Sequence, residues 1–223
     1  MPQKRNKKIL VYIFLFLIFG TLNNKNLNYK NFSKIDKIVV EGLDKNDNFE
    51  LENSLTLLEV NDLFFLDKSK ISKIINSNNL VEKYYVFKKY PSTLNIKIDK
   101  TKILAQLKKD GDSFFLGSNN RLIKKRDVTY EVPFIFGDFE NKNFFELKKA
   151  IDESNFDYKE ISKLFSFKSG RWDIETNNGL LIKLPKNKIK KSLSIIDNII
   201  NEYKDYKIYK IDLRQNNQVI ING

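Results

Sequence analysis

The pattern of apolar and polar positions divides the chain into a short apolar start and a much longer, mostly polar remainder. Residues 9–22 form one apolar run, and the basic residues before it are Lys4, Arg5, Lys7 and Lys8. Basic residues beside a spanning segment stay on the cytoplasmic side of a membrane. We therefore predict a cytoplasmic tail over residues 1–8 and a single transmembrane anchor over residues 9–22, with the remaining roughly 200 residues outside the cytoplasm.

The apolar run is short for an anchor, which leaves one alternative. At about 1.5 Å of rise per residue, residues 9–22 extend roughly 21 Å, whereas the hydrocarbon core of a bilayer is about 30 Å thick. Lys7 and Lys8 can reach the headgroups, and local thinning can cover part of the difference. A cleaved signal peptide has a similar basic start and apolar centre, but cleavage needs small residues, and the first alanine is Ala105. The sequence favours a retained anchor.

Residues 35–107 show the pattern of a small α+β domain, and the polar, aperiodic residues 23–34 before it are interpreted as a linker. The elements predicted there are a strand at Ile35–Gly42, a helix capped by Asn48 with Phe49, Leu51, Leu55 and Leu58 on one side, a helix capped by Asp67 with Ile71, Ile74 and Ile75 on one side, and strands at Val81–Lys89 and Thr93–Leu107. A turn at Tyr90, Pro91 and Ser92 separates the two strands. Proline fixes its own φ and keeps the preceding residue extended, so we interpret this turn as structural.

Residues 108–223 predict a second, β-rich domain. Strands are expected at Ser113–Leu116, Val132–Phe136, Arg171–Glu175, Gly179–Leu184 and Lys207–Leu213, and helices over residues 143–154 and 188–203. The second helix is amphipathic, with Leu193, Ile196, Ile199, Ile200 and Tyr203 on one face. A last strand-like piece, Gln218–Ile221, can pair back as a hairpin across residues 215–217. Trp172, the only tryptophan, is expected to be a core anchor rather than a ligand platform.

Two missing residue types limit the chemistry. The chain has no cysteine and no histidine, so disulfides, thiolate metal sites and a Ser-His-Asp triad are excluded. The acidic stretch Asp44–Glu50 resembles a calcium loop, but Phe49 and Leu55 stand where such a loop needs glycine and glutamate. No serine is followed three residues later by lysine, and no glycine-rich phosphate loop is present. We predict a protein that is not an enzyme and that has no cofactor, metal site or small-molecule substrate.

The net charge of +12 raises the question of a nucleic-acid partner. Only five arginines are present, namely Arg5, Arg121, Arg126, Arg171 and Arg214. The guanidinium fork that binds phosphates and guanine edges is therefore scarce, and the lysines are spread along the whole chain. We predict no nucleic-acid partner and expect the charge to keep the protein soluble or close to anionic lipid.

Five short segments in order resemble the FtsQ/DivIB family of cell-division proteins. They are Lys88–Ile98 (KKYPSTLNIKI), Val132–Gly137 (VPFIFG), Arg171–Ile174 (RWDI), Gly179–Pro185 (GLLIKLP) and Ile211–Arg214 (IDLR). The signature residues among them are Tyr90, Pro91, Thr93, Leu94, Trp172 and Pro185. Three positions depart from the family pattern: Lys100 replaces an acidic residue, Ile103 a common proline, and Gln215 an aromatic residue that some relatives carry.

The resemblance implies a single-pass inner-membrane protein with a membrane-proximal POTRA domain of order β-α-α-β-β over residues 35–107 and a mixed β-sheet domain over residues 108–223. It also implies a non-enzymatic divisome scaffold at the septum, with a cytoplasmic N-terminus and a periplasmic bulk that binds partners of the FtsB and FtsL type. The alternative is a POTRA-type chaperone or assembly module for outer-membrane proteins.

The C-terminal stretch is the candidate site. Tyr209, Ile211 and Leu213 alternate with Lys210, Asp212 and Arg214, as in a half-buried strand. A strand near the chain end often lies at a sheet edge, where another chain can add a strand. The resemblance implies that FtsB docks at this edge, with Arg214, Gln215, Asn217 and Val219 as contact residues. The alternative is a solvated edge with Arg214 paired to a neighbouring carboxylate.

Overall fold

The computed structural model describes residues 6–22, 34–57, 63, 65–126, 128–203, 206–215 and 218–222. Helix α1 (Asn6–Leu22) covers the predicted anchor, and its described side chains from Lys7 to Gly20 are exposed. Among the described residues, no helix combines the length and the apolar character needed to cross a membrane. Lys4, Arg5 and all of the predicted linker except Lys34 lie outside the described residues.

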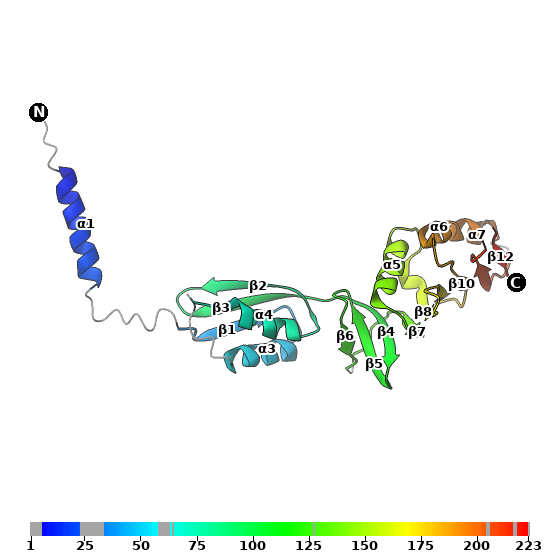
Figure 1. The fold of residues 1–223 in the computed structure, drawn as a ribbon, viewed down its shortest axis with the longest axis horizontal. Helices are drawn as coiled ribbons and strands as arrows, with labels where there is room; N and C mark the ends of the chain where they lie inside the picture. The colour runs from blue at the N-terminus through cyan, green and yellow to red at the C-terminus, as the bar shows by residue number, and fades with distance from the viewer. Residues whose placement is uncertain are drawn as a thin grey trace, which may run out of the picture. The chain divides into compact units, whose positions relative to one another are not determined.

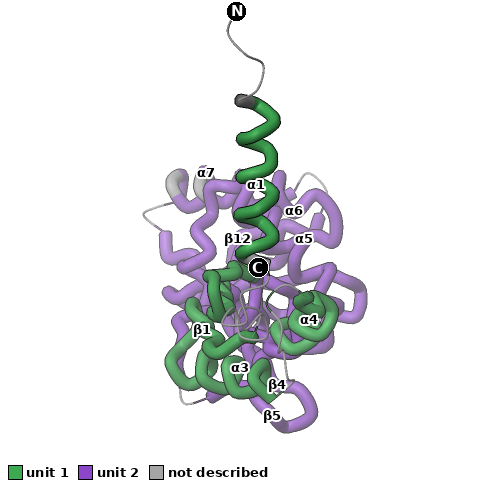
Figure 2. The backbone as a smooth tube through the Cα atoms, turned by 90° about the vertical axis from the view of Figure 1, so that its left-hand side faces the viewer, with its two compact units in different colours: residues 1–75, 84–98 green, residues 76–83, 99–223 purple. Residues whose placement is uncertain are grey.

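The chain forms two compact units (Figure 2). Unit 1 contains residues 1–75 and 84–98, and unit 2 contains residues 76–83 and 99–223. This division differs from the boundary that we expected at residue 107. The single strand predicted over Thr93–Leu107 is two strands, β3 (Thr93–Lys100) and β4 (Ile103–Lys109), and β4 pairs with β5 (Asp112–Gly117) of unit 2.

The three-stranded sheet has the order β1-β3-β2, with β1 (Lys37–Glu41) parallel to β3 and with β2 (Val81–Lys89) at one edge. Helices α3 (Lys45–Leu57) and α4 (Lys68–Ser77) lie on one side of these strands (Figure 1). The element order β-α-α-β-β is the order predicted from periodicity. Buried side chains at Val40, Leu55, Ile75, Leu94 and Ile96 form the core of this fold.

The two helices begin differently. The Asp67 side chain accepts hydrogen bonds from the N–H groups of Ser69 and Lys70 at 3.0 and 3.2 Å, so it caps α4 as predicted. Helix α3 begins three residues before the predicted cap Asn48, which lies inside it. The Asn48 side chain instead exchanges two hydrogen bonds with the backbone of Leu43.

Unit 2 contains a nine-stranded mixed sheet of order β12-β11-β10-β9-β8-β7-β4-β5-β6. The remaining strands are β6 (Leu122–Lys124), β7 (Phe134–Phe136), β8 (Ile161–Ser166), β9 (Trp172–Thr176), β10 (Leu181–Lys183), β11 (Lys210–Asp212) and β12 (Ile220–Ile221). The helices are α5 (Asn141–Asp152), a 3-10 turn (Tyr158–Glu160), α6 (Ile189–Ser194) and α7 (Ile196–Glu202). The pairs β4–β7, β7–β8 and β10–β11 are parallel.

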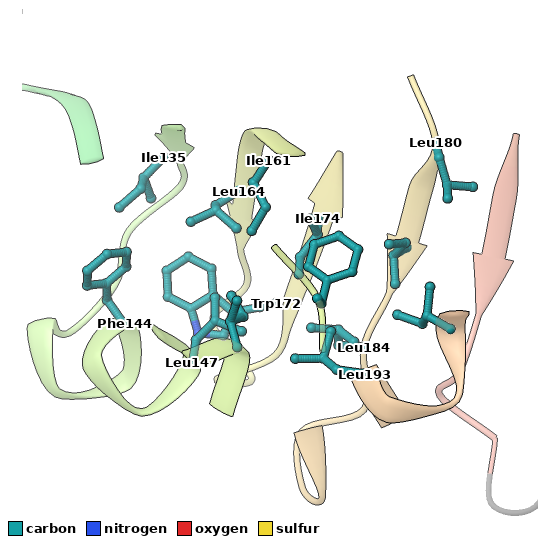
Figure 3. Close-up of a cluster of buried hydrophobic side chains, with 14 of the residues drawn as sticks. Ile135, Phe144, Leu147, Ile161, Leu164, Trp172, Ile174, Leu180, Leu184 and Leu193 are labelled. Carbon is teal, nitrogen blue, oxygen red and sulfur yellow. The ribbon is translucent and has the colours of Figure 1, made fainter. Parts of the chain in front are cut away.

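One face of this sheet carries the core. An aliphatic row crosses seven strands in register and consists of Leu107, Ile135, Leu164, Ile174, Ile182, Ile211 and Ile221. Residues of α5, α6 and α7 belong to the same buried cluster. Trp172 is 1% exposed, and its ring lies 6.4 Å from that of Phe144 on α5 (Figure 3), so the prediction of a core tryptophan is confirmed.

Candidate docking edge of the sheet

The last strand of the chain, β12, forms one edge of the nine-stranded sheet. It pairs antiparallel with β11, with Ile211 opposite Ile221 and Asp212 opposite Ile220. The hairpin predicted for Gln218–Ile221 is therefore confirmed. We expected the strand around Tyr209–Leu213 to be the edge itself, and this expectation is wrong, because β11 lies between β10 and β12.

The backbone of β12 presents hydrogen-bonding groups on both of its sides. Asn222 donates its N–H to the Lys210 carbonyl oxygen at 2.9 Å, so Asn222 and Ile220 direct their backbone groups toward β11. Because successive strand residues alternate in direction, Ile221 directs its groups away from β11. Among the described residues, no strand pairs with that outer side. The outer side of β12 is thus an open edge with a donor and an acceptor at Ile221, and Val219 directly precedes this strand.

Asn222 holds the end of the β11–β12 hairpin in place. This role of Asn222 was not predicted from the sequence. Its side-chain oxygen accepts from the N–H groups of Tyr209 and Lys210 at 2.9 and 3.3 Å, and its side-chain nitrogen donates to the Lys207 carbonyl oxygen at 2.9 Å. The Tyr209 hydroxyl donates to the Asn222 carbonyl oxygen at 3.0 Å. Asn222 has a φ of 57°, a left-handed conformation that asparagine tolerates better than most residues. An asparagine after a short apolar strand is the only sequence signal for this arrangement.

A pocket of about 260 Å³ lies beside the open edge. Helix α6 and the loop before it contribute one part of the lining, and the C-terminal hairpin contributes the other. The lining residues are Pro185, Asn187, Lys188, Lys191, Ser192, Ile195, Leu213, Gln215, Gln218 and Val219. Val219 is 39% exposed. The pocket therefore offers a partly apolar space for a side chain that enters next to the edge.

The sheet face opposite the core carries a row of charges near this edge. The row across the strands is Phe136, Phe165, Asp173, Lys183, Asp212 and Ile220. The Arg214 guanidinium donates to Asp212, with Nε at 2.8 Å from Oδ1, and these hydrogen bonds hold the pKa of the Asp212 carboxyl below its usual range. Burial raises the pKa of Asp173, although Arg171, whose Nε lies 3.3 Å from its carboxylate, opposes the shift.

The predicted contact residues occupy different places. Arg214 makes the ion pair with a neighbouring carboxylate that we named as the alternative for a solvated edge. Gln215 and Val219 line the pocket, and both precede β12, with Val219 directly next to it. Asn217 lies outside the described residues. Among the signature residues, Tyr90 and Pro91 lie in the β2–β3 turn, Thr93 and Leu94 begin β3, and Pro185 follows β10.

Two family models match adjacent parts of the chain. The model described as "POTRA domain, FtsQ-type" matches residues 33–101, and the model described as "Cell division protein FtsQ/DivIB, C-terminal" matches residues 105–214. Residues 215–222, which include β12, lie beyond both matches.

Similar proteins carry related names. Cell division protein DivIB of Bacillus subtilis is 31% identical over 133 residues, which cover 57% of this chain and 48% of that protein, about half its length. Cell division protein FtsQ of Rickettsia bellii is 22% identical over 191 residues, which cover 84% of this chain and 72% of that protein. A solved structure of the major extracytoplasmic domain of Geobacillus stearothermophilus DivIB (trans isomer) aligns with 49% of this chain and 98% of that chain at 14% identity. Its TM-score of 0.36 is too low to support a structural conclusion.

Proposed function

The chain belongs to the FtsQ/DivIB family of cell-division proteins, and we propose that it is a non-enzymatic scaffold of the bacterial division machinery. In this proposal it binds partners of the FtsB and FtsL type during septation, by accepting a strand at the outer side of β12. The single observation that carries the proposal is the open outer side of β12, where the backbone groups of Ile221 are directed away from β11.

Strand addition needs an edge strand that is held in place before the partner binds, and the C-terminal hairpin meets this requirement. Five hydrogen bonds join Asn222 side-chain or backbone groups to residues 207–210, and the Ile221 side chain packs against the core. Backbone hydrogen bonds supply affinity in such a complex, while pockets for alternate side chains supply selectivity. The pocket next to Val219 supports the second requirement, because it lies beside the backbone groups that the partner would use.

Membrane attachment through α1 is part of the proposal. Every residue from Ile9 to Phe19 is a large apolar residue, and their exposed fractions range from 37% to 77%. Such a surface is unfavourable in water and favourable in lipid. We place the N-terminus in the cytoplasm and both units outside it, because Lys4, Arg5, Lys7 and Lys8 precede the apolar run.

A fluorescent fusion of the full chain tests the cellular role. A division scaffold concentrates at midcell before constriction, whereas an assembly module for outer-membrane proteins is distributed around the envelope. Co-purification of an FtsB-type partner from the same cells tests the docking edge. Midcell enrichment together with partner recovery supports the proposal. Uniform distribution around the envelope contradicts the division role, and midcell enrichment without any FtsB-type partner contradicts the docking edge.

A further inference from the structure

The family-signature segment around Tyr90 has no role in the docking edge, yet it forms a distinctive end of unit 1. The turn at residues 90–92 joins β2 to β3, and the start of β1 lies against it. The N–H groups of Asp36 and Lys37 approach the Ser92 carbonyl oxygen at 2.9 and 3.3 Å. Residue 34, the first described residue after α1, belongs to the same end, so this is where the chain enters the unit.

This end combines exposed aromatic rings with lysines. Tyr90 is 61% exposed and Phe87 is 49% exposed. Four exposed lysines and one exposed carboxylate lie in the same two segments of the chain; these charged residues are Lys34, Lys37, Lys88, Lys89 and Asp36. We call the seven residues Lys34, Asp36, Lys37, Phe87, Lys88, Lys89 and Tyr90 the basic-aromatic tip; its formal net charge is +3.

We propose that the basic-aromatic tip binds the headgroup region of a bilayer that contains anionic phospholipid. Aromatic side chains with one polar and one apolar part favour the membrane–water interface. Each lysine close to an anionic surface contributes about 1 kcal/mol, which corresponds to roughly fivefold in the binding constant. The attraction acts only within about 8–10 Å of the surface at physiological salt, so contact must be close.

The covalent link to α1 keeps the basic-aromatic tip close to the bilayer. The inference therefore rests on the proposed membrane attachment of α1. Leu22 and Lys34 are twelve residues apart in the sequence, and an extended chain spans at most about 3.6 Å per residue, or roughly 43 Å in total. The tip thus stays within this distance of the end of α1, and a high local concentration favours a weak surface contact.

A site-specific fluorescent probe can test the contact, because the chain has no cysteine of its own. Ser92→Cys places the probe at the tip. Asn46→Cys is the control, because α3 begins after β1 has run away from the tip, so Asn46 lies at the opposite end of unit 1. The full chain is reconstituted into vesicles of phosphatidylcholine with about 30% phosphatidylglycerol, or of phosphatidylcholine alone. Quenching by lipids that carry a nitroxide near the headgroup reports contact.

We expect strong quenching at position 92 in the anionic vesicles, little at position 46, and loss of the difference in phosphatidylcholine or at 0.5 M salt. The double variant Lys88→Gln, Lys89→Gln should weaken the contact roughly 20-fold or more, whereas Lys45→Gln, Lys97→Gln, at the far end of the unit, should not. Equal quenching at both positions, or no dependence on phosphatidylglycerol in the unsubstituted tip, overturns the inference. Flotation with phosphatidylcholine vesicles reports α1 attachment separately, so failure of the anchor is distinguishable from failure of the tip.

Discussion

Replacing Val219 by proline is the most informative single change at the open edge. Val219 directly precedes β12, and where a partner strand extends the pairing we expect its N–H to face the partner. Proline has no N–H, so Val219→Pro removes this donor, while the pairing of Ile220 with Asp212 and the bond from Asn222 to Lys210 remain. Ile220→Pro is the matched control, because it removes a donor directed toward β11. Val219→Ala is the second control, since it shortens the same side chain and keeps the N–H.

The expected effect follows from one backbone hydrogen bond. A net bond contributes about 1 kcal/mol, and a partner carbonyl left without a donor in a dry interface costs about 1–2 kcal/mol more. A loss of about 2–3 kcal/mol weakens the dissociation constant roughly 30- to 150-fold. The Val219 N–H makes no bond to β11, so the free energy of unfolding should change by less than about 0.5 kcal/mol. Ile220→Pro should instead lower the stability of the hairpin.

Isothermal titration calorimetry of the full chain with the extracytoplasmic segment of an FtsB-type partner gives the dissociation constants, and thermal melting followed by circular dichroism gives the stabilities. Wild-type affinity in the Val219→Pro variant would refute strand addition at β12. Equal losses for Val219→Pro and Val219→Ala would show that the side chain, not the backbone donor, carries the contact.

Three further changes test the fold. Trp172→Ala should lower the free energy of unfolding by about 3–5 kcal/mol in urea titrations, and a loss below about 1 kcal/mol would contradict its place in the core. Gly42→Ala should destabilise unit 1, because a Cβ atom there would lie 1.8 Å from the Ile98 carbonyl oxygen at a φ of 116°; an unchanged melting temperature would contradict that close approach. Burial raises the pKa of Asp173, so the folded protein holds this proton at a pH where the unfolded chain has lost it, and stability should fall as pH rises from about 4 through the raised pKa. Asp173→Asn should flatten that part of the stability–pH curve, and an unaltered curve would count against the buried carboxyl.

The alternation of apolar and polar residues and the helix-capping residues predict most of the fold, because both patterns depend only on residues that are close together in the sequence. Strand β2 coincides with the predicted Val81–Lys89, and Asp67 caps α4. Strand β8 was not predicted, because its two buried residues, Ile161 and Leu164, are three positions apart and do not alternate with polar residues. The other residues of the strand include Ser162, Lys163 and Ser166, which are polar. The predicted helix over residues 188–203 is interrupted at Ile195, between α6 and α7. No glycine or proline marks this break, so tertiary packing decides it.

The candidate site was predictable in its location but not in its detail. Apolar alternation and a hairpin signal indicate a pair of C-terminal strands. Which of the two lies at the edge depends on long-range pairing of β10 with β11, which local patterns do not encode. The direction of the backbone groups at Ile221 depends on register, and the role of Asn222 depends on a left-handed backbone directly after β12.

Photo-cross-linking from the C-terminal hairpin in living cells is the most direct measurement of the docking surface. A photoreactive residue is placed at Gln215, Val219 or Ile220, and at Lys124 on β6, the opposite edge of the sheet. We predict cross-links to a partner of the FtsB type from the hairpin positions and none from Lys124. Absence of any protein cross-link from the hairpin, or equal labelling from Lys124, would contradict a docking function for this edge.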